Sequence, residues 1–295
     1  MKILVFDIGG TSIKYGYCID NVLEQVNETP TDAKKGGRYV IDTVIALIKE
    51  ADGYDAIGIS TAGQVNAETG SIIYANSNIP GYTGMKIKEE LEALFHVPVA
   101  VENDVNSAAL GEAIAGAGKE HENFLCLTYG TGVGGAIIQK KTVYHGSSFS
   151  AAEFGAIVTH SAERKNKEDF YDGCYERYAS TTALVKMAME YDSTLDNGRK
   201  IFAQIDNPDI MNILDAWVDE IMMGLATLTH IFNPSCIIVG GGIMVQPLII
   251  EKIHQKMNQY IMPSFSHVKI IPANLGNSAG LLGANHLAAQ LLNNK

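Results

Sequence analysis

A short pattern that occurs twice constrains the fold of this 295-residue chain more than any other feature. Each copy is an apolar run, a glycine-rich turn and a second apolar run. The first copy spans residues 3–19 with its turn at Gly9-Gly10, and the second spans residues 124–139 with its turn at 130–135. Apolar runs of this length joined by such turns predict β-hairpins, and their recurrence indicates a duplicated unit.

Runs with helical and with strand periodicity alternate along the rest of the chain. Apolar residues at helical spacing predict helices over 40–48, 87–94, 210–228 and 281–292, and small residues after Asp104 predict one more. Short apolar runs predict further strands at 56–60, 97–101 and 236–239. This alternation predicts an α/β fold.

The length is typical of two domains of ordinary size. We expect one domain at 1–115, completed by the C-terminal helix 280–295, and the other at 116–279. The boundary between them is expected in the loop Gly116–Gly118.

The composition excludes several classes of protein. A formal charge of −11 argues against a protein that binds nucleic-acid phosphates or an anionic membrane. Four widely spaced cysteines do not form a disulfide framework and are typical of the core of a reduced, cytoplasmic protein. The apolar start is too short for a signal peptide, and no apolar stretch approaches the roughly 18 residues that span a bilayer.

Both glycine turns could bind an anion. In Asp7–Lys14, two glycines let backbone N–H groups converge on one point, and the acid that ends the strand suits a metal-bound water of Mg²⁺. The turn at 130–135 matches G-x-G-x-x-G, but a strand and not a helix follows it, which disfavours a dinucleotide site. A second phosphate cradle fits better. The alternative for the first turn is an ordinary hairpin turn with an Asp cap, and the alternative for the second is a glycine bulge between strands.

Two further motifs follow predicted strands. Gly240, Gly241 and Gly242 end a buried strand, where bare backbone can lie against a flat ring such as adenine. The alternative is close packing of a helix on the strand. Asn103 and Asp104 end another strand and open a helix. They are favoured N-cap residues, but a carboxylate at this position can also take a proton from an attacking hydroxyl.

In order and spacing, these motifs resemble the sugar kinases of the ROK family, within the hexokinase–actin-like superfamily. The resemblance runs through nearly the whole chain. Its segments are DIGGTSIK at 7–14, ISTAGQVN at 59–66, VENDVNSAALGE at 101–112, LTYGTGVGGAII at 127–138, CYERYASTTAL at 174–184, IFNPSCIIVGGGI at 231–243 and NSAGLLGA at 277–284.

The resemblance implies a two-lobed actin-like ATPase fold of the ribonuclease H type, with a cleft between the lobes, and transfer of the ATP γ-phosphoryl to a sugar 6-hydroxyl. The residues implied to meet the ATP phosphates and Mg²⁺ are Asp7, Gly9, Gly10, Thr11 and Lys14 in one lobe and Thr131, Gly132 and Gly134 in the other. Gly240, Gly241 and Gly242 would border the adenosine. Asp104 resembles the general base, and the implied sugar partners are Asn103, Glu153, Glu176 and the backbone near Gly63.

The chain departs from the family at a zinc site. Many members hold zinc through one His and three Cys, in E-x-G-H and C-x-C-G-x-x-G-C-x-E. Here the His position is Ala156, two Cys positions are Lys167 and Asp169, and only Cys174 remains, with His160 nearby. A tetrahedral site needs four ligands, so we expect no structural zinc.

The same departure bears on the substrate. In zinc-bearing relatives the His also lies near the C1 and C2 oxygens of the sugar, so Ala156 removes a donor and leaves space. We therefore expect the sugar substrate to carry a substituent on C1 or C2. A C1 substituent means a β-glucoside, which we favour, and a C2 substituent means an N-acetyl sugar such as N-acetylmannosamine. Plain glucose is the third alternative.

Two other classes share parts of this pattern. Sugar-responsive repressors of the family carry an extra N-terminal DNA-binding segment, whereas the first predicted strand begins here at Ile3. An actin-like filament ATPase would share the phosphate turns but does not need Asn103, Asp104, Glu153 and Glu176. The resemblance favours a homodimeric enzyme.

Overall fold

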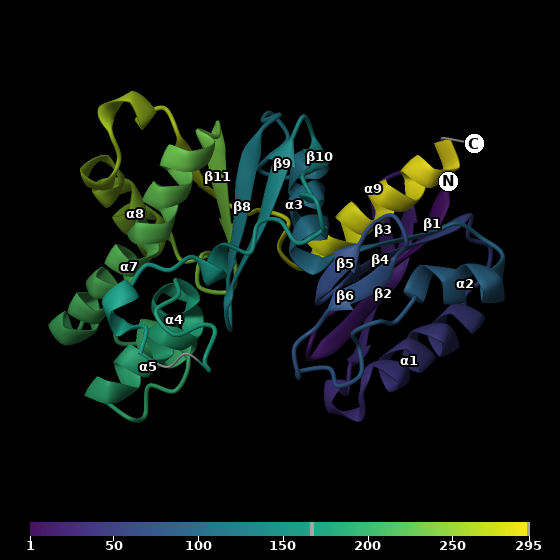
Figure 1. Cartoon of the computed structure of the whole chain (residues 1–295), viewed down its shortest axis with the longest axis horizontal. Helices are drawn as coiled ribbons and strands as arrows, with labels where there is room; N and C mark the ends of the chain where they lie inside the picture. The colour runs from purple at the N-terminus through teal and green to yellow at the C-terminus, as the bar shows by residue number, and fades with distance from the viewer. Residues whose placement is uncertain (166–167, 294–295) are drawn as a thin grey trace. The chain divides into compact units, whose positions relative to one another are not determined.

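The structure, a computed structural model, describes residues 1–165 and 168–293 (Figure 1). The chain divides into two compact units. The first unit contains Met1–Lys119, Lys141–Ala151 and the C-terminal residues from Leu275, and the second contains Glu120–Lys140 and Ala152–Asn274. No helix among the described residues is long and apolar enough to cross a membrane.

The first unit is built on one mixed sheet, in the order β3-β2-β1-β4-β7. Its strands are β1 (Lys2–Ile8), β2 (Ser12–Ile19), β3 (Val22–Pro30), β4 (Ala56–Thr61) and β7 (Val99–Asn103). Strands β1, β2 and β3 pair antiparallel, whereas β1, β4 and β7 pair parallel. The first predicted hairpin is therefore confirmed, and its register places Asp7 opposite Lys14.

Helices cover both faces of this sheet. Because side chains alternate along a strand, Leu4, Phe6 and Ile8 of β1 face one core with α1 (Gly37–Lys49) and α2 (Ile87–Phe95). Ile3 and Val5 face the other core, with Leu281 and Ala288 of α9 (Ala279–Asn293). Figure 1 shows α1 and α2 together, with α9 beyond the sheet. Helix α3 (Asp104–Ala115) packs against α9 so closely that a Cβ on Gly283 would clash with the carbonyl of Ser107.

The second unit repeats the same plan. The sheet strands that belong to this unit follow the order β9-β8-β11-β12, with an antiparallel hairpin and two parallel neighbours. The strands are β8 (Phe124–Tyr129), β9 (Val133–Gln139), β11 (Cys236–Gly240) and β12 (Lys269–Pro272). The main helices are α5 (Thr181–Tyr191), α7 (Pro208–Phe232) and α8 (Pro247–Tyr260), with the shorter α4 (Glu176–Ala179) and α6 (Gly198–Phe202). The second predicted hairpin is thus confirmed as well.

The structure adds features that periodicity does not indicate. Strand β3 carries mostly exposed side chains, so it lacks a clear apolar run, and the hairpin of β5 (Gln64–Asn66) and β6 (Ser71–Tyr74) consists of only short strands. The segment 141–151, with β10 (Thr142–Val143), lies in the first unit. There Lys141 Nζ donates to the carbonyls of Ala113, Gly118 and Lys119, at 3.0, 2.8 and 2.6 Å. These bonds satisfy carbonyls at the end of α3.

Candidate functional site

The turn between β1 and β2 presents open backbone. Gly9 N donates to Ser12 O at 3.0 Å, and Thr31 Oγ donates to Gly9 O at 2.7 Å, so the bend is fixed from both sides. A Cβ on Gly10 would meet nothing within 4 Å. Gly10 and Thr11 are both exposed. The predicted phosphate residues Gly9, Gly10 and Thr11 therefore form a held turn with room for an anion beside it.

Asp7 is held beside this turn. Its Oδ1 accepts a hydrogen bond from Ser60 Oγ at 2.7 Å, and α9 begins so close that a Cβ on Gly280 would lie 2.9 Å from the same oxygen. Burial raises the pKa of the Asp7 carboxyl, and Ser60 and the charge of Lys14 oppose that rise. Lys14 Nζ itself donates to Asn277 Oδ1 at 3.1 Å. A carboxylate at the end of a strand beside open amides suits Mg²⁺, which prefers oxygen ligands and retains waters.

Asn103 and Asp104 lie at the start of α3, in the same unit. Asn103 Oδ1 caps the helix by accepting from Val105 N at 2.9 Å and Asn106 N at 3.0 Å. Its Nδ2 donates to Gly63 O and to Asp104 Oδ1, both at 2.9 Å. Gly63 has φ of +98°, which favours glycine. Three predicted site residues, Gly63, Asn103 and Asp104, are thus joined by one side chain, and the predicted capping role of Asn103 is confirmed.

The surroundings of Asp104 disfavour the charged form of its carboxyl. Burial raises its pKa to about 6, and the negative charge of Asp7 adds to the rise. Hydrogen bonds from Val105 N and Asn103 oppose it. A carboxylate with a pKa near the working pH is an effective general base.

The β8–β9 turn in the second unit is also fixed from within. Gly130 N donates to Gly132 O at 3.0 Å, and Thr181 N donates to Gly130 O at 2.9 Å. Thr131 is exposed, and a Cβ on Gly130 would meet nothing within 4 Å. On the other side, a Cβ on Gly132 would lie 2.7 Å from Glu176 Oε2. The turn therefore has an open face and a face occupied by a carboxylate.

Glu176 joins the predicted phosphate turn to the predicted sugar residues of this unit. Burial raises the pKa of Glu176, a hydrogen bond from Val133 N opposes the rise, and the charge of Glu153 adds to it. Glu153 is exposed and precedes the short 3-10 helix Phe154–Ala156. Gly134 lies in β9, opposite Thr128 of β8. Glu153, Glu176, Gly132 and Gly134 thus belong to one neighbourhood.

A cavity of about 640 Å³ opens beside this turn. Its lining residues are Tyr129, Gly130, Thr131, Thr181, Asn197, Gly198, Arg199, Phe202, Gly242, Ile243 and Gln246. Gly241 has φ of +108°, and a Cβ there would clash with the carbonyl of Tyr129, so the glycine run packs against β8. Gly242 has open space beside it, whereas Gly240 is buried at the end of β11. The predicted ring-binding glycines and one phosphate turn therefore border the same cavity, which suits a nucleoside phosphate.

Several residues of this cavity were not predicted from the sequence. Asn197, Arg199 and Phe202 lie at or near α6, whose sequence GRKIF contains none of the motifs used for the prediction. Thr181 follows Ser180, the N-cap of α5, and this position at the start of a helix is the one sequence signal that could have indicated a binding role for Thr181. Ser60, which bonds Asp7, looked like an ordinary buried strand residue.

The residues that stand at the family's zinc-ligand positions make other contacts. Lys167 lies outside the described residues. Cys174 Sγ donates to Phe170 O at 3.5 Å, and Asp169 pairs with Arg177 at 2.7 Å. His160 stacks on Tyr178 with ring centroids 3.7 Å apart. Among the residues that the structure describes, no three His, Cys, Asp or Glu side chains cluster as a metal site. The absence of zinc stays a prediction for metal analysis.

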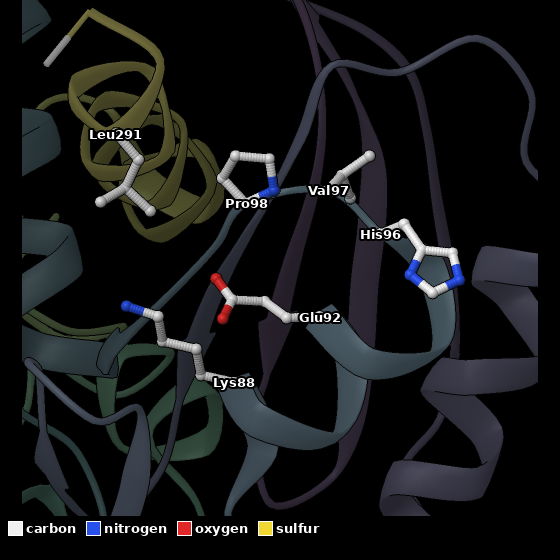
Figure 2. A pocket seen from close by; sticks show the side chains of 6 residues that line it. All are labelled: Lys88, Glu92, His96, Val97, Pro98 and Leu291. Atoms are coloured by element: carbon white, nitrogen blue, oxygen red, sulfur yellow. The ribbon is translucent and has the colours of Figure 1, made fainter. Parts of the chain in front are cut away.

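The first unit has a second cavity, of about 320 Å³, away from any predicted site residue. Lys88 and Glu92 project from α2 toward Pro98 and Leu291, whereas His96 points away (Figure 2). Glu92 Oε1 accepts from Val99 N at 3.1 Å, and Lys88 Nζ donates to Glu68 O at 3.3 Å. These two hydrogen bonds join α2 to neighbouring backbone and so stabilise the fold of the first unit.

Comparison with known proteins places this geometry in context. The ROK family matches residues 3–291. A β-glucoside kinase of Listeria monocytogenes is 33% identical over 96% of this chain and 96% of its own length.

Two solved structures have the same fold. Lmo2764 of Listeria monocytogenes, a candidate N-acetylmannosamine kinase, is 30% identical with a TM-score of 0.89, over 99% of this chain and 100% of its own. A ROK family glucokinase of Streptomyces griseus, in complex with glucose and AMPPNP, is 29% identical with a TM-score of 0.84, over 98% and 100%. This similarity confirms the predicted fold class, an α/β fold of the actin-like ATPase type.

Proposed function

Because the chain belongs to the ROK family and matches its sugar kinases over nearly its whole length, it is an ATP-dependent carbohydrate kinase, and we propose that it phosphorylates the 6-hydroxyl of a β-glucoside. Asp104 carries this proposal. It is an acid at a helix start, with a pKa of about 6, tied by Asn103 to the Gly63 turn. We further propose that the enzyme acts in the cytoplasm as a homodimer, as the family resemblance implies.

In the proposed reaction, Asp104 orients the sugar hydroxyl and accepts its proton late in the transfer. The hydroxyl oxygen forms a bond to the γ-phosphorus, the bond from that phosphorus to the β,γ-bridging oxygen breaks, and ADP leaves. Phosphoryl transfer depends mainly on positioning and on charge stabilisation. Asn103 therefore contributes by holding Asp104 Oδ1 and Gly63 O in one arrangement.

The glycine turns supply the phosphate contacts of this proposal. We assign phosphate oxygens to the backbone of Gly9, Gly10 and Thr11 and to the turn Thr131–Gly134, and adenosine to the cavity that Gly242 borders. Within that cavity, Phe202 and Ile243 offer apolar surface and Asn197, Arg199 and Gln246 offer polar groups.

The residues present also fit Mg²⁺. Asp7 lies one residue before the end of β1, beside the open β1–β2 turn, and Lys14 lies opposite it in the register. Asp7 would hold Mg²⁺ when the ion is bound with ATP, and the ion would supply positive charge against the negative charge that develops during the transfer.

Ala156 supports a substituted sugar as the substrate. Ala156 is the last residue of the 3-10 helix Phe154–Ala156, which directly follows Glu153. Gly155 of this helix lies beside the carboxylate of Glu176. A methyl group at this position occupies less space than an imidazole and donates no hydrogen bond. The space suits a substituent on C1 or C2, and the similarity to a β-glucoside kinase favours the C1 substituent. N-acetylmannosamine is the second candidate, because a C2 acetamide would also need space there.

A sugar panel with ATP and Mg²⁺, read by a coupled ADP assay, tests the substrate. We expect kcat/KM to rank cellobiose above N-acetylmannosamine and glucose. Equal or better use of glucose would refute an enlarged pocket. Asp104→Asn is the control for the chemistry, since it preserves size and removes the base, and we expect it to lower kcat by about 10²-fold or more.

A further inference from the structure

A second buried carboxylate lies directly behind the proposed general base. Glu102 is fully buried at the end of β7, one residue before the N-cap of α3. Its Oε1 accepts from Asn103 N at 2.8 Å and from Asn106 Nδ2 at 3.0 Å. In an ordinary capping box, the third residue of the helix binds the N-cap amide. Here Glu102 takes that amide and also engages Asn106, the third residue.

The carboxylate of Glu102 therefore fixes the backbone of the N-cap residue Asn103. Asn103 uses its Oδ1 for the amides of Val105 and Asn106 and its Nδ2 for Asp104 Oδ1 and Gly63 O. A change in the position of the Asn103 backbone would move all of these contacts. The orientation of Asp104 thus depends on a side chain that does not touch it.

His145, when it is protonated, is a counter-ion for Glu102. Its Nε2 lies 2.6 Å from Glu102 Oε2, and its side chain is 25% exposed. Among the donors that reach Glu102 in the described part of the chain, only His145 can carry a positive charge. A buried carboxylate without a counter-ion is strongly unfavourable. The bond to Glu102 raises the pKa of His145 despite partial burial, and the charge of Glu68 adds to the rise.

His145 also belongs to the segment 141–151. Ser150 Oγ of this segment donates to Gln64 Oε1 at 3.0 Å, next to Gly63. Phe149 packs on His145 with ring centroids 5.7 Å apart. The segment therefore contacts the elements that carry Gly63 and Asn103.

We propose that Glu102 and His145 form a positioning pair, in which the imidazolium holds Glu102 in place and Glu102 sets the Asn103-Asp104 turn for catalysis. The pair is not part of the chemistry, and its effect on turnover rests on the proposed kinase function. The pair itself is a property of the first unit and can be tested without any substrate.

The first experiment tests the pair by NMR titration of the histidine side chains. His145→Gln identifies the His145 signal by its absence. We expect His145 to titrate above the ordinary value of about 6.5 in the wild type and to return toward that value in Glu102→Gln. Titration of wild-type His145 at or below the ordinary value would overturn the pair. If the wild type phosphorylates no sugar while His145 still titrates high, the proposed function fails and the pair stands.

The second experiment is a double-mutant cycle on turnover. We expect His145→Ala to lower kcat for the sugar by about 10–100-fold while the KM for ATP changes by less than about 3-fold. In the Glu102→Gln background there is no buried charge to balance, so we expect the same change to lower kcat by less than about 3-fold. Equal losses in both backgrounds would show that His145 acts by another route.

Two variants separate positioning from mere attachment of the segment. Lys141→Met removes the three bonds from Lys141 to carbonyls near the end of α3 but leaves Glu102 untouched. We expect its kcat to stay within about 2-fold of the wild type. A loss as large as that of His145→Ala would refute the positioning role.

If His145→Ala does not fold, His145→Gln keeps a donor without the charge, and we expect a smaller but measurable loss of kcat. Wild-type turnover in His145→Gln would then count against the need for the charge.

Discussion

Replacing Asp104 by Asn should make the protein more stable and nearly inactive. In the folded state the pKa of Asp104 is about 6, against 3.8 when unperturbed. Between these values the folded protein binds more protons than the unfolded chain, so the carboxyl destabilises the fold increasingly as the pH rises. A shift of about two pKa units corresponds to about 3 kcal/mol once the pH is above 6, and to about half of that at pH 5.

The amide of Asn removes this penalty without losing the local contacts. Its Oδ1 can accept the same hydrogen bonds from Val105 N and Asn103 Nδ2, each 2.9 Å long in the structure. We expect Asp104→Asn to raise the free energy of unfolding of the first unit by up to about 3 kcal/mol at pH 7.5, with a smaller gain at pH 5. Turnover should fall by about 10²-fold or more, because Asn cannot accept the proton.

Urea unfolding followed by far-UV circular dichroism at both pH values measures this change. Asp55→Asn is the matched control, since Asp55 is exposed in the same unit and accepts from Lys2 N. We expect the control to shift stability by less than about 0.5 kcal/mol. An Asp104→Asn protein that is no more stable than the wild type at pH 7.5 would refute the desolvation of Asp104.

Four further results are expected. The kcat/KM of the wild type should fall as the pH drops through about 6, because the base is active only when deprotonated, and a flat profile down to pH 5 would contradict the role of Asp104. Gly132→Ala should lower kcat/KM by more than about 10-fold in the coupled assay, since its Cβ would lie 2.7 Å from Glu176 Oε2; unchanged kinetics would show that this turn is not at the site. Phe202→Ala should raise the KM for ATP by about 10-fold with little change in the sugar KM, and the opposite pattern would remove the nucleotide from the cavity. Ala156→His should shift the ratio of kcat/KM from cellobiose toward glucose by about 10-fold, and an unchanged ratio would refute the space argument.

Much of the fold follows from local patterns in the sequence. The two hairpins were predictable because apolar periodicity and glycine turns are short-range signals, and the structure pairs them as expected. The long helix was predicted over 210–228, and in the structure α7 spans Pro208–Phe232. Strand β3 was not predicted, because an edge strand with many exposed polar side chains has little apolar periodicity.

The candidate site likewise contains residues that motifs predict and residues that only the tertiary structure brings together. Asp7, Asn103, Asp104 and the glycine turns stand at strand ends, where motif and position coincide. Glu102 and His145 are 43 residues apart, and only the tertiary fold brings their side chains to 2.6 Å. A carboxylate before an N-cap looks like an ordinary strand residue in the sequence.

The packing of α9 has a consequence for the order in which the protein is made. The strands of the first sheet leave the ribosome first, yet one face of β1 is completed by Leu281 and Ala288 near the end of the chain. That apolar face stays uncovered while the whole second unit is translated. We therefore expect a chain truncated before α9 to leave this apolar face open and prone to aggregation.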